Sequence, residues 1–261
     1  MTSFLKIALV QSNLVWENTL QNRLNFTAKI ESLSGKADLV VLPELFTSGF
    51  TMQPENIAET MNGETINWLK ELTKKFNLAI TGSLVIKIDN TYRNRLIFVK
   101  PSGDLQFYDK SHSFSLAGED KVYTSGNKKL IIDYKGFKIC PLICYDLRFP
   151  VFSRNKENYD VLLYVANWPK QRIEAWKTLL KARAIENMSY CVGVNRVGLD
   201  ANNYEYSGDS AAYNVLGEKE SNLEAYKEGI DIIAISKNHI REARQKLSFL
   251  NDMDNFELRL D

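Results

Sequence analysis

The sequence is poor in the residues that mark several common protein classes. Its 261 residues include only three cysteines, and none of them has CxxC spacing. An odd number cannot all pair with one another, so the chain has no disulfide framework that includes every cysteine. This composition fits a protein of the reducing cytoplasm. Only two histidines occur, and no His/Cys/Asp cluster has metal-ligand spacing, so we expect neither a metal nor another cofactor. No window approaches the roughly 20 apolar residues of a membrane-spanning helix.

The chain also lacks an excess of either basic or acidic residues. The 33 basic and 32 acidic residues leave a net charge of +1, and no dense basic run occurs. Nothing therefore attracts the chain to nucleic acid or to an anionic membrane. The first apolar stretch, 5–11, is too short for a signal peptide and has no small-residue cleavage site, so it predicts a strand in a cytoplasmic protein.

Apolar and amphipathic runs alternate along the chain. We predict strands at 5–11, 37–45, 78–87, 159–167 and 189–198, hairpins at 93–110 and 128–146, and a strand-rich stretch at 207–236. We predict helices at 16–34, 64–76, 170–188 and 237–247. This pattern favours a layered α/β fold with helices over the sheet faces. No linker or repeat divides the chain, so we predict one domain, 1–261.

Cys144 lies where an apolar strand ends and a charged segment begins, a place from which a thiol can react. A lone cysteine in an apolar run is more often a packing residue, and we interpret Cys140 and Cys191 in that way. A nucleophilic thiol also needs a group that accepts its proton. The choice between these interpretations of Cys144 therefore depends on its partners.

The possible partners are few. His112 is one candidate, because His239 belongs to the charged C-terminal stretch. A buried carboxylate can also accept the proton, and Glu44 follows an apolar run in VVLPELF, although a loop glutamate exposed to solvent would give the same pattern. Lys110 ends a third strand, where a surface lysine is the alternative. Because sites gather at the carboxyl ends of strands in α/β folds, the three residues together predict a site.

The segments around these residues resemble a known family. LPELF around Glu44, YDKSHSF around Lys110 and CYDLRFP around Cys144 resemble the three signature blocks of the nitrilase superfamily of carbon–nitrogen hydrolases, in the same order. Segments 166–198 and 206–218 are similar to its amidase-type branch and, more narrowly, to the omega-amidases. Omega-amidases hydrolyse the terminal amide of 2-oxoglutaramate and 2-oxosuccinamate.

The resemblance implies a fold, an assembly and a set of roles. The fold is a single-domain, four-layer α-β-β-α sandwich, which pairs into a homodimer. Cys144 is the nucleophile, Glu44 the general acid and base, and Lys110 the group that stabilises the oxyanion. A second glutamate after the lysine orients the site, and we assign this role to Glu119, with Asp120 as the alternative.

A short keto-acid amide needs a cation for its carboxylate. Arg148 is our first candidate and Arg172 our second, because arginine binds carboxylates in a bidentate manner. A structural ion pair is the alternative for Arg148, and a solvated position is the alternative for Arg172. Phe46, Tyr145 and Trp168 are candidate walls of the substrate pocket, although aromatic residues are also ordinary core.

Three functions remain open at this point. The first is an omega-amidase that takes a small-molecule amide. The second is another enzyme of the family, such as an N-carbamoyl amino-acid amidohydrolase or a short aliphatic amidase; YDLRFP disfavours a nitrile hydrolase. The third is an inactive scaffold, which the intact Glu44, Lys110 and Cys144 disfavour.

Overall fold

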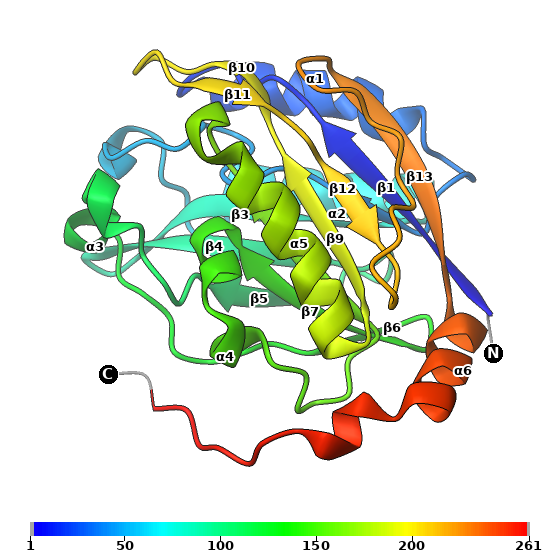
Figure 1. Cartoon of the computed structure of the whole chain (residues 1–261). Coiled ribbons are helices and arrows are strands. Elements are labelled where there is room, and N and C mark those ends of the chain that lie inside the picture. The colour runs from blue at the N-terminus through cyan, green and yellow to red at the C-terminus, as the bar shows by residue number, and fades with distance from the viewer. Residues whose placement is uncertain (1–2, 260–261) are drawn as a thin grey trace.

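Two β-sheets stacked face to face form the middle of the molecule, with helices outside them (Figure 1). The computed structural model describes residues 3–259; residues 1, 2, 260 and 261 of the predicted domain lie outside the described part. The larger sheet has the order β13 (Gly229–Ser236), β1 (Phe4–Gln11), β2 (Leu39–Val41), β3 (Ala79–Ile88), β4 (Thr91–Val99) and β5 (Leu105–Asp109). The smaller sheet has the order β12 (Ala211–Tyr213), β9 (Tyr190–Asn195), β8 (Val161–Ala166), β7 (Phe137–Ile143) and β6 (Ile132–Tyr134).

The strands at the centre of both sheets are parallel. β2 pairs in parallel with β1 and β3, and β8 pairs in parallel with β7 and β9. Antiparallel partners extend each sheet outward, and β10 (Val197–Leu199) and β11 (Glu205–Ser207) form a separate hairpin. The carboxyl ends of parallel strands share one edge of a sheet, where ligand sites of α/β proteins gather.

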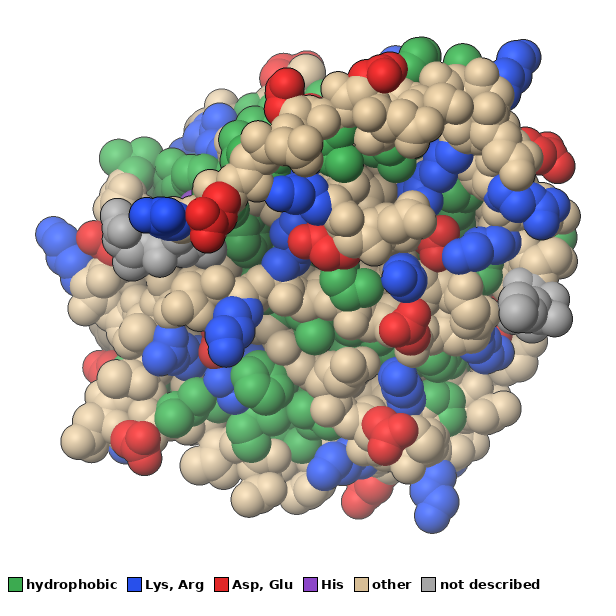
Figure 2. Space-filling view, turned by 90° about the horizontal axis from the view of Figure 1, so that it is seen from below, with side chains coloured by type: hydrophobic (Ala, Val, Ile, Leu, Met, Phe, Trp, Pro, Cys, Tyr) green, Lys and Arg blue, Asp and Glu red, His purple; other side chains and the backbone are tan. Residues whose placement is uncertain are grey.

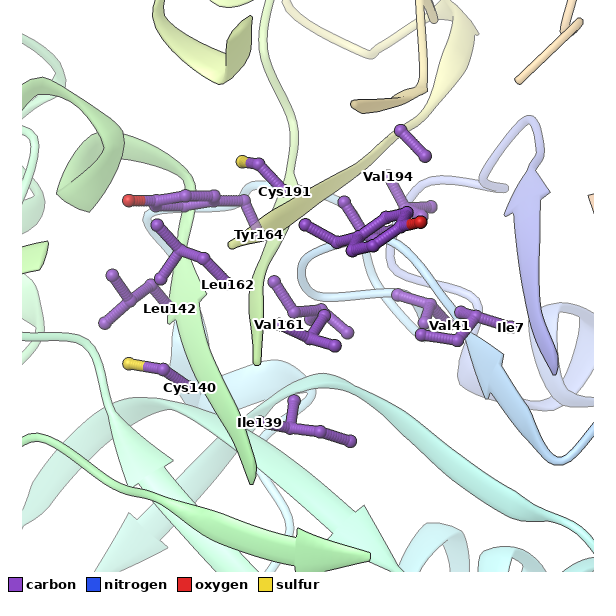
Figure 3. Packing of buried hydrophobic residues seen from close by; sticks show 14 of the residues in the cluster. Ile7, Val41, Ile139, Cys140, Leu142, Val161, Leu162, Tyr164, Cys191 and Val194 are labelled. Carbon is purple, nitrogen blue, oxygen red and sulfur yellow. The ribbon is translucent and has the colours of Figure 1, made fainter. Parts of the chain in front are cut away.

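The side chains of β1 show how the layers pack. Ile7 and Leu9 belong to the core between the sheets, whereas Ala8 and Val10 face the helices α1 (Thr19–Glu31) and α2 (Glu64–Phe76). Figure 3 shows the packing between the sheets, with Ile7 of β1, Val41 of β2 and Val161 of β8 among the side chains of this core. On the outer side of the smaller sheet, α5 (Ile173–Asn187) packs against β9 and β12 (Figure 1). The predicted four-layer sandwich is confirmed.

Most predicted elements are present, and two differ. The helix predicted at 64–76 is α2, with the same bounds, and the helix predicted at 237–247 is α6 (Lys237–Leu247). The strand predicted at 37–45 is wrong in length, because only Leu39–Val41 pair; Pro43 has no N–H to donate and Leu45 turns the chain with a φ of 44°. The strand predicted at 189–198 divides at Arg196 into β9 and β10.

The remaining helical pieces are short. They are η1 (Pro54–Asn56), η2 (Ser115–Ala117), α3 (Glu119–Val122), η3 (Cys144–Arg148), α4 (Pro150–Ser153), η4 (Lys170–Arg172) and η5 (Phe249–Asp252). Across residues 3–259, none of the helices has the length and apolar character needed to cross a membrane. Basic and acidic side chains are scattered among one another on the face shown in Figure 2, as the balanced composition predicts.

Candidate active site

Glu44, Lys110 and Cys144 come together although each follows a different strand. Lys110 directly follows β5, Cys144 directly follows β7, and Glu44 lies in the turn after β2. Lys110 Nζ donates to Glu44 Oε1 at 2.9 Å, and Glu44 is close enough to Cys144 to raise the pKa of its thiol. Glu44 is fully buried and Lys110 is 3% exposed. Neither residue is therefore the solvent-exposed loop or surface group that its sequence position also allowed.

Glu119 joins the same cluster as a second carboxylate. It begins α3, is fully buried, and accepts hydrogen bonds from Lys110 Nζ on both carboxylate oxygens at 2.9 Å. The backbone N–H of Phe114 also donates to its Oε2 at 2.6 Å. Asp120 is exposed. The structure therefore places Glu119, rather than its neighbour, beside the lysine.

Two asparagines that the sequence did not single out hold the carboxylates. Asn94 Nδ2 donates to Glu44 Oε1 at 2.8 Å and to Glu119 Oε1 at 3.2 Å. The backbone N–H of Asn167 donates to Glu44 Oε2 at 2.8 Å, and its Nδ2 donates to the Glu44 carbonyl oxygen at 2.6 Å. Asn167 directly follows β8, and this position at the end of a strand could have identified it as a site residue. Asn94 lies inside β4, where nothing in the sequence pattern indicates a role in the site.

Burial and the charges of this cluster together shift the pKa values of Lys110 and of the Cys144 thiol. Burial alone would lower the pKa of Lys110, but the carboxylates of Glu119 and Glu44 raise it well above its ordinary value. Burial, and then the charge of Glu44, raise the pKa of the Cys144 thiol, and Lys110 only partly opposes this. Both burial and the charge of Glu44 therefore favour the neutral thiol of Cys144 over the thiolate. Any reaction through this sulfur would need a group that accepts the thiol proton.

The other two cysteines lie elsewhere. Cys140 and Cys191 are fully buried in the core of the sandwich, and burial raises the pKa of both thiols. Figure 3 shows them among apolar side chains. Cys144 instead is partly exposed and adopts a left-handed backbone conformation, with a φ of 43°. The structure thus separates one accessible thiol from two packed ones.

A cavity of about 570 Å³ opens onto Cys144 and Lys110. Four of the five predicted substrate-binding residues line it, namely Tyr145, Arg148, Trp168 and Arg172. The prediction for Phe46 is wrong. That residue is fully buried and packs against Phe26 and Trp68 on the helix-covered side of the larger sheet, because the turn at Leu45 directs it away from the cavity. The cavity is also lined by residues that the sequence did not suggest, among them Phe50, Phe114, Asp200 and Tyr206.

The two arginines of the cavity lie over aromatic rings. The Arg148 guanidinium carbon is 5.0 Å from the centroid of the Trp168 ring, and that of Arg172 is 5.0 Å from the Phe114 ring. Within residues 3–259, no carboxylate forms an ion pair with either arginine. The structural ion pair considered for Arg148 is therefore absent from this part of the chain, and both guanidinium groups can meet an anion.

Comparison with known proteins identifies the family of the chain. The model of the carbon–nitrogen hydrolase family matches residues 6–245. The chain belongs to the carbon–nitrogen hydrolase family. It is 41% identical to the omega-amidase YafV of Escherichia coli, over 97% of this chain and 98% of that protein. It is 32% identical to a 2-oxoglutaramate amidase of Bacillus subtilis, over 86% and 88% of the two chains.

The fold of this carbon–nitrogen hydrolase is also found in a solved relative. A crystal structure of a CN-hydrolase superfamily protein from Xanthomonas campestris, which has an arsenic adduct in its active site, superposes with a TM-score of 0.96. The two chains are 41% identical, and the match covers 99% of this chain and 100% of the other. The predicted resemblance to the nitrilase superfamily and to its omega-amidase branch is confirmed.

Proposed function

We propose that this enzyme hydrolyses the terminal amide of short keto-acid amides, 2-oxoglutaramate and 2-oxosuccinamate, with Cys144 as its nucleophile. The observation that carries the catalytic part is the contact of one accessible thiol with a buried carboxylate that is also bound to a lysine. The names of relatives at 41% and 32% identity support the substrate part.

The proposed reaction has two halves. Cys144 Sγ attacks the amide carbonyl while its proton passes to Glu44, which then protonates the departing nitrogen, so that ammonia leaves and a thioester remains. Lys110 Nζ and the backbone N–H of Tyr145 stabilise the oxyanion. Water then attacks the thioester, Glu44 takes a proton from it and returns one to the sulfur, and the acid leaves. Glu119 keeps Lys110 in place through the two contacts at 2.9 Å.

Arg148 is the residue that we expect to bind the substrate carboxylate. It is exposed in the cavity, four positions after the nucleophile and without an ion-pair partner in the described residues. We expect Arg148→Gln to lower kcat/KM for 2-oxoglutaramate roughly thirtyfold to hundredfold, the value of a charge-assisted contact of about 2–3 kcal/mol. Ammonia release across a panel of amides measures it.

The panel needs a neutral short amide, an N-carbamoyl amino acid and a second variant. Arg172→Gln, in the same cavity, is the matched control and should lose less. An equal loss of Arg148→Gln on keto-acid amides and neutral amides would mean that Arg148 only supports the nucleophile turn. A wild-type enzyme that cleaves N-carbamoyl amino acids and ignores keto-acid amides would refute the proposed substrate.

We also expect the enzyme to be a homodimer in the cytoplasm. Val151 of α4, Ile185 of α5 and Leu216 are exposed apolar residues, with exposed fractions of 51%, 46% and 47%, and Ile185 lies against Gly217. A second copy that covers this side should bury on the order of 1,600 Å² in total. Light scattering at micromolar concentration should give twice the mass of 29.9 kDa. The mass of a single chain would contradict the expectation.

A further inference from the structure

Asp146, two residues after the nucleophile, connects two parts of the active site. It is fully buried. Its Oδ2 accepts hydrogen bonds from the backbone N–H of Ile143 at 2.9 Å and from the hydroxyl of Tyr108 at 2.8 Å. Its Oδ1 accepts one from the backbone N–H of His112 at 3.0 Å and lies 2.8 Å from His112 Nδ1. One side chain thus contacts both the Cys144 turn and the Lys110 segment.

On one side, Asp146 fixes the turn of the nucleophile. Cys144 has a φ of 43°, which costs a residue other than glycine about 1–2 kcal/mol and persists only where neighbouring contacts impose it. The bond from Ile143 N–H to Asp146 closes a loop around Cys144, because it joins the residue before the cysteine to the second residue after it. This contact therefore stabilises the direction in which the thiol points.

On the other side, Asp146 holds the segment that carries the lysine. Tyr108 and His112 lie two residues before and two residues after Lys110, and both bind the same carboxylate. Burial, and then the Asp146 charge, raise the pKa of Tyr108, so its hydroxyl stays protonated and donates. Both flanks of Lys110 are therefore tied to the chain that carries Cys144.

The His112 ring strengthens this connection. It stacks on Phe149, with ring centroids 3.6 Å apart and an angle of 11° between the planes, and it meets Phe152 edge to face at 5.0 Å. Phe149 directly follows η3, the helical turn that Cys144 begins. His112 thus contacts Asp146 near the start of that turn and Phe149 at its end. His112, which the sequence suggested as a possible base, here connects Asp146 to Phe149.

The geometry points to Asp146 as a positioning residue that, with His112, sets the Cys144 thiol against Glu44 and Lys110. The inference rests on the proposed function, because these three residues are the groups that react in it. Asp146 itself binds three backbone or side-chain N–H groups and one hydroxyl, and it does not line the cavity. It acts through the groups that it holds.

Asp146→Asn is the direct test. Asparagine has the same size but only one acceptor oxygen, so its NH₂ group must face donors on one side. We expect kcat to fall about 100-fold, as for a misplacement of roughly 1 Å, while KM changes less than about twofold. We also expect alkylation of Cys144 by iodoacetamide to slow about tenfold, because it too requires a proton acceptor in place.

Asp160→Asn is the matched control. Asp160 is also buried, and it binds the Lys138 N–H and the Lys237 ammonium at the amino end of β8, away from Cys144. It should lower the melting temperature and leave kcat and alkylation unchanged. Wild-type values of kcat and alkylation in folded Asp146→Asn would overturn the inference.

Tyr108→Phe provides a second test of the same contact. If Asp146→Asn does not fold, Tyr108→Phe keeps the ring but removes the hydroxyl, which donates to Asp146 Oδ2 at 2.8 Å and accepts from the Ser111 N–H at 3.1 Å. It should lower kcat about threefold to tenfold, and unchanged kcat would overturn the inference. A wild-type enzyme that turns over no keto-acid amide refutes the proposed substrate alone. The rate of alkylation, which needs no amide, still decides the role of Asp146.

Discussion

Cys144→Ala should release no ammonia above background from any amide that the wild type cleaves, a loss of roughly 10⁴-fold or more. Among the cysteines of residues 3–259, Cys144 is the one that lines the cavity and lies beside Glu44. The variant should keep its fold, because the side chain lies at the edge of a cavity and is only partly buried. Ammonia release and thermal unfolding measure the two effects.

The other cysteines provide the controls for this experiment. Cys140→Ala and Cys191→Ala remove a fully buried side chain from the core and should cost about 0.5–3 kcal/mol of stability. Both should retain most of the activity, because neither residue lines the cavity. Iodoacetamide should label wild type at Cys144 alone and should not label native Cys144→Ala. Full turnover by Cys144→Ala would eliminate the thioester mechanism.

Helix bounds and tight turns could be predicted from the sequence, because residues close together in the chain determine them. The bounds of α2 follow from its apolar spacing, and the turn between β4 and β5 follows from Gly103, whose φ is 87°. The order of strands could not be predicted in this way. Phe4 of β1 pairs with Ser236 of β13, at the other end of the chain, and no residue near either position encodes that partner.

The candidate site shows the same division. Glu44, Lys110 and Cys144 could be found because each interrupts the polarity pattern at the end of a predicted strand, and a family resemblance joined them. The role of Asn94 could not be predicted, because it depends on contacts between β4 and two carboxylates, Glu44 and Glu119, that come from other segments of the chain. Phe46 was misassigned because the turn at Leu45, with its φ of 44°, reverses the side on which the next residue lies.

Lys110→Met should reduce both activity and stability. Lys110 is 3% exposed, and its ammonium binds two fully buried carboxylates, Glu44 and Glu119, at 2.9 Å. Without it, two carboxylates face each other in the interior, and a broken buried ion pair of this kind costs about 3–5 kcal/mol at neutral pH. Loss of an oxyanion donor should lower kcat about 10²- to 10³-fold. Urea unfolding and ammonia release measure the two losses.

The loss of stability in Lys110→Met should depend on pH. Burial raises the pKa of Glu119, Lys110 opposes that increase, and the charge of Glu44 adds to it, so removal of the lysine raises the pKa further. A carboxyl group whose pKa is higher in the folded state than in the unfolded state stabilises the fold fully below the unfolded value, about 4.3 for glutamate. That stability is lost as pH rises through the folded value.

Lys110→Met should therefore be closest to wild type near pH 5 and fall furthest below it near pH 8. Lys177→Met is the control, because Lys177 pairs with Asp209 at 3.1 Å and Glu174 at 3.6 Å on the surface. It should cost at most about 1 kcal/mol, with little change between the two pH values. If the two variants gave parallel curves, Lys110 would not be the charge that keeps the pKa of Glu119 from rising further, and its assignment as the cation that holds this cluster together would be wrong.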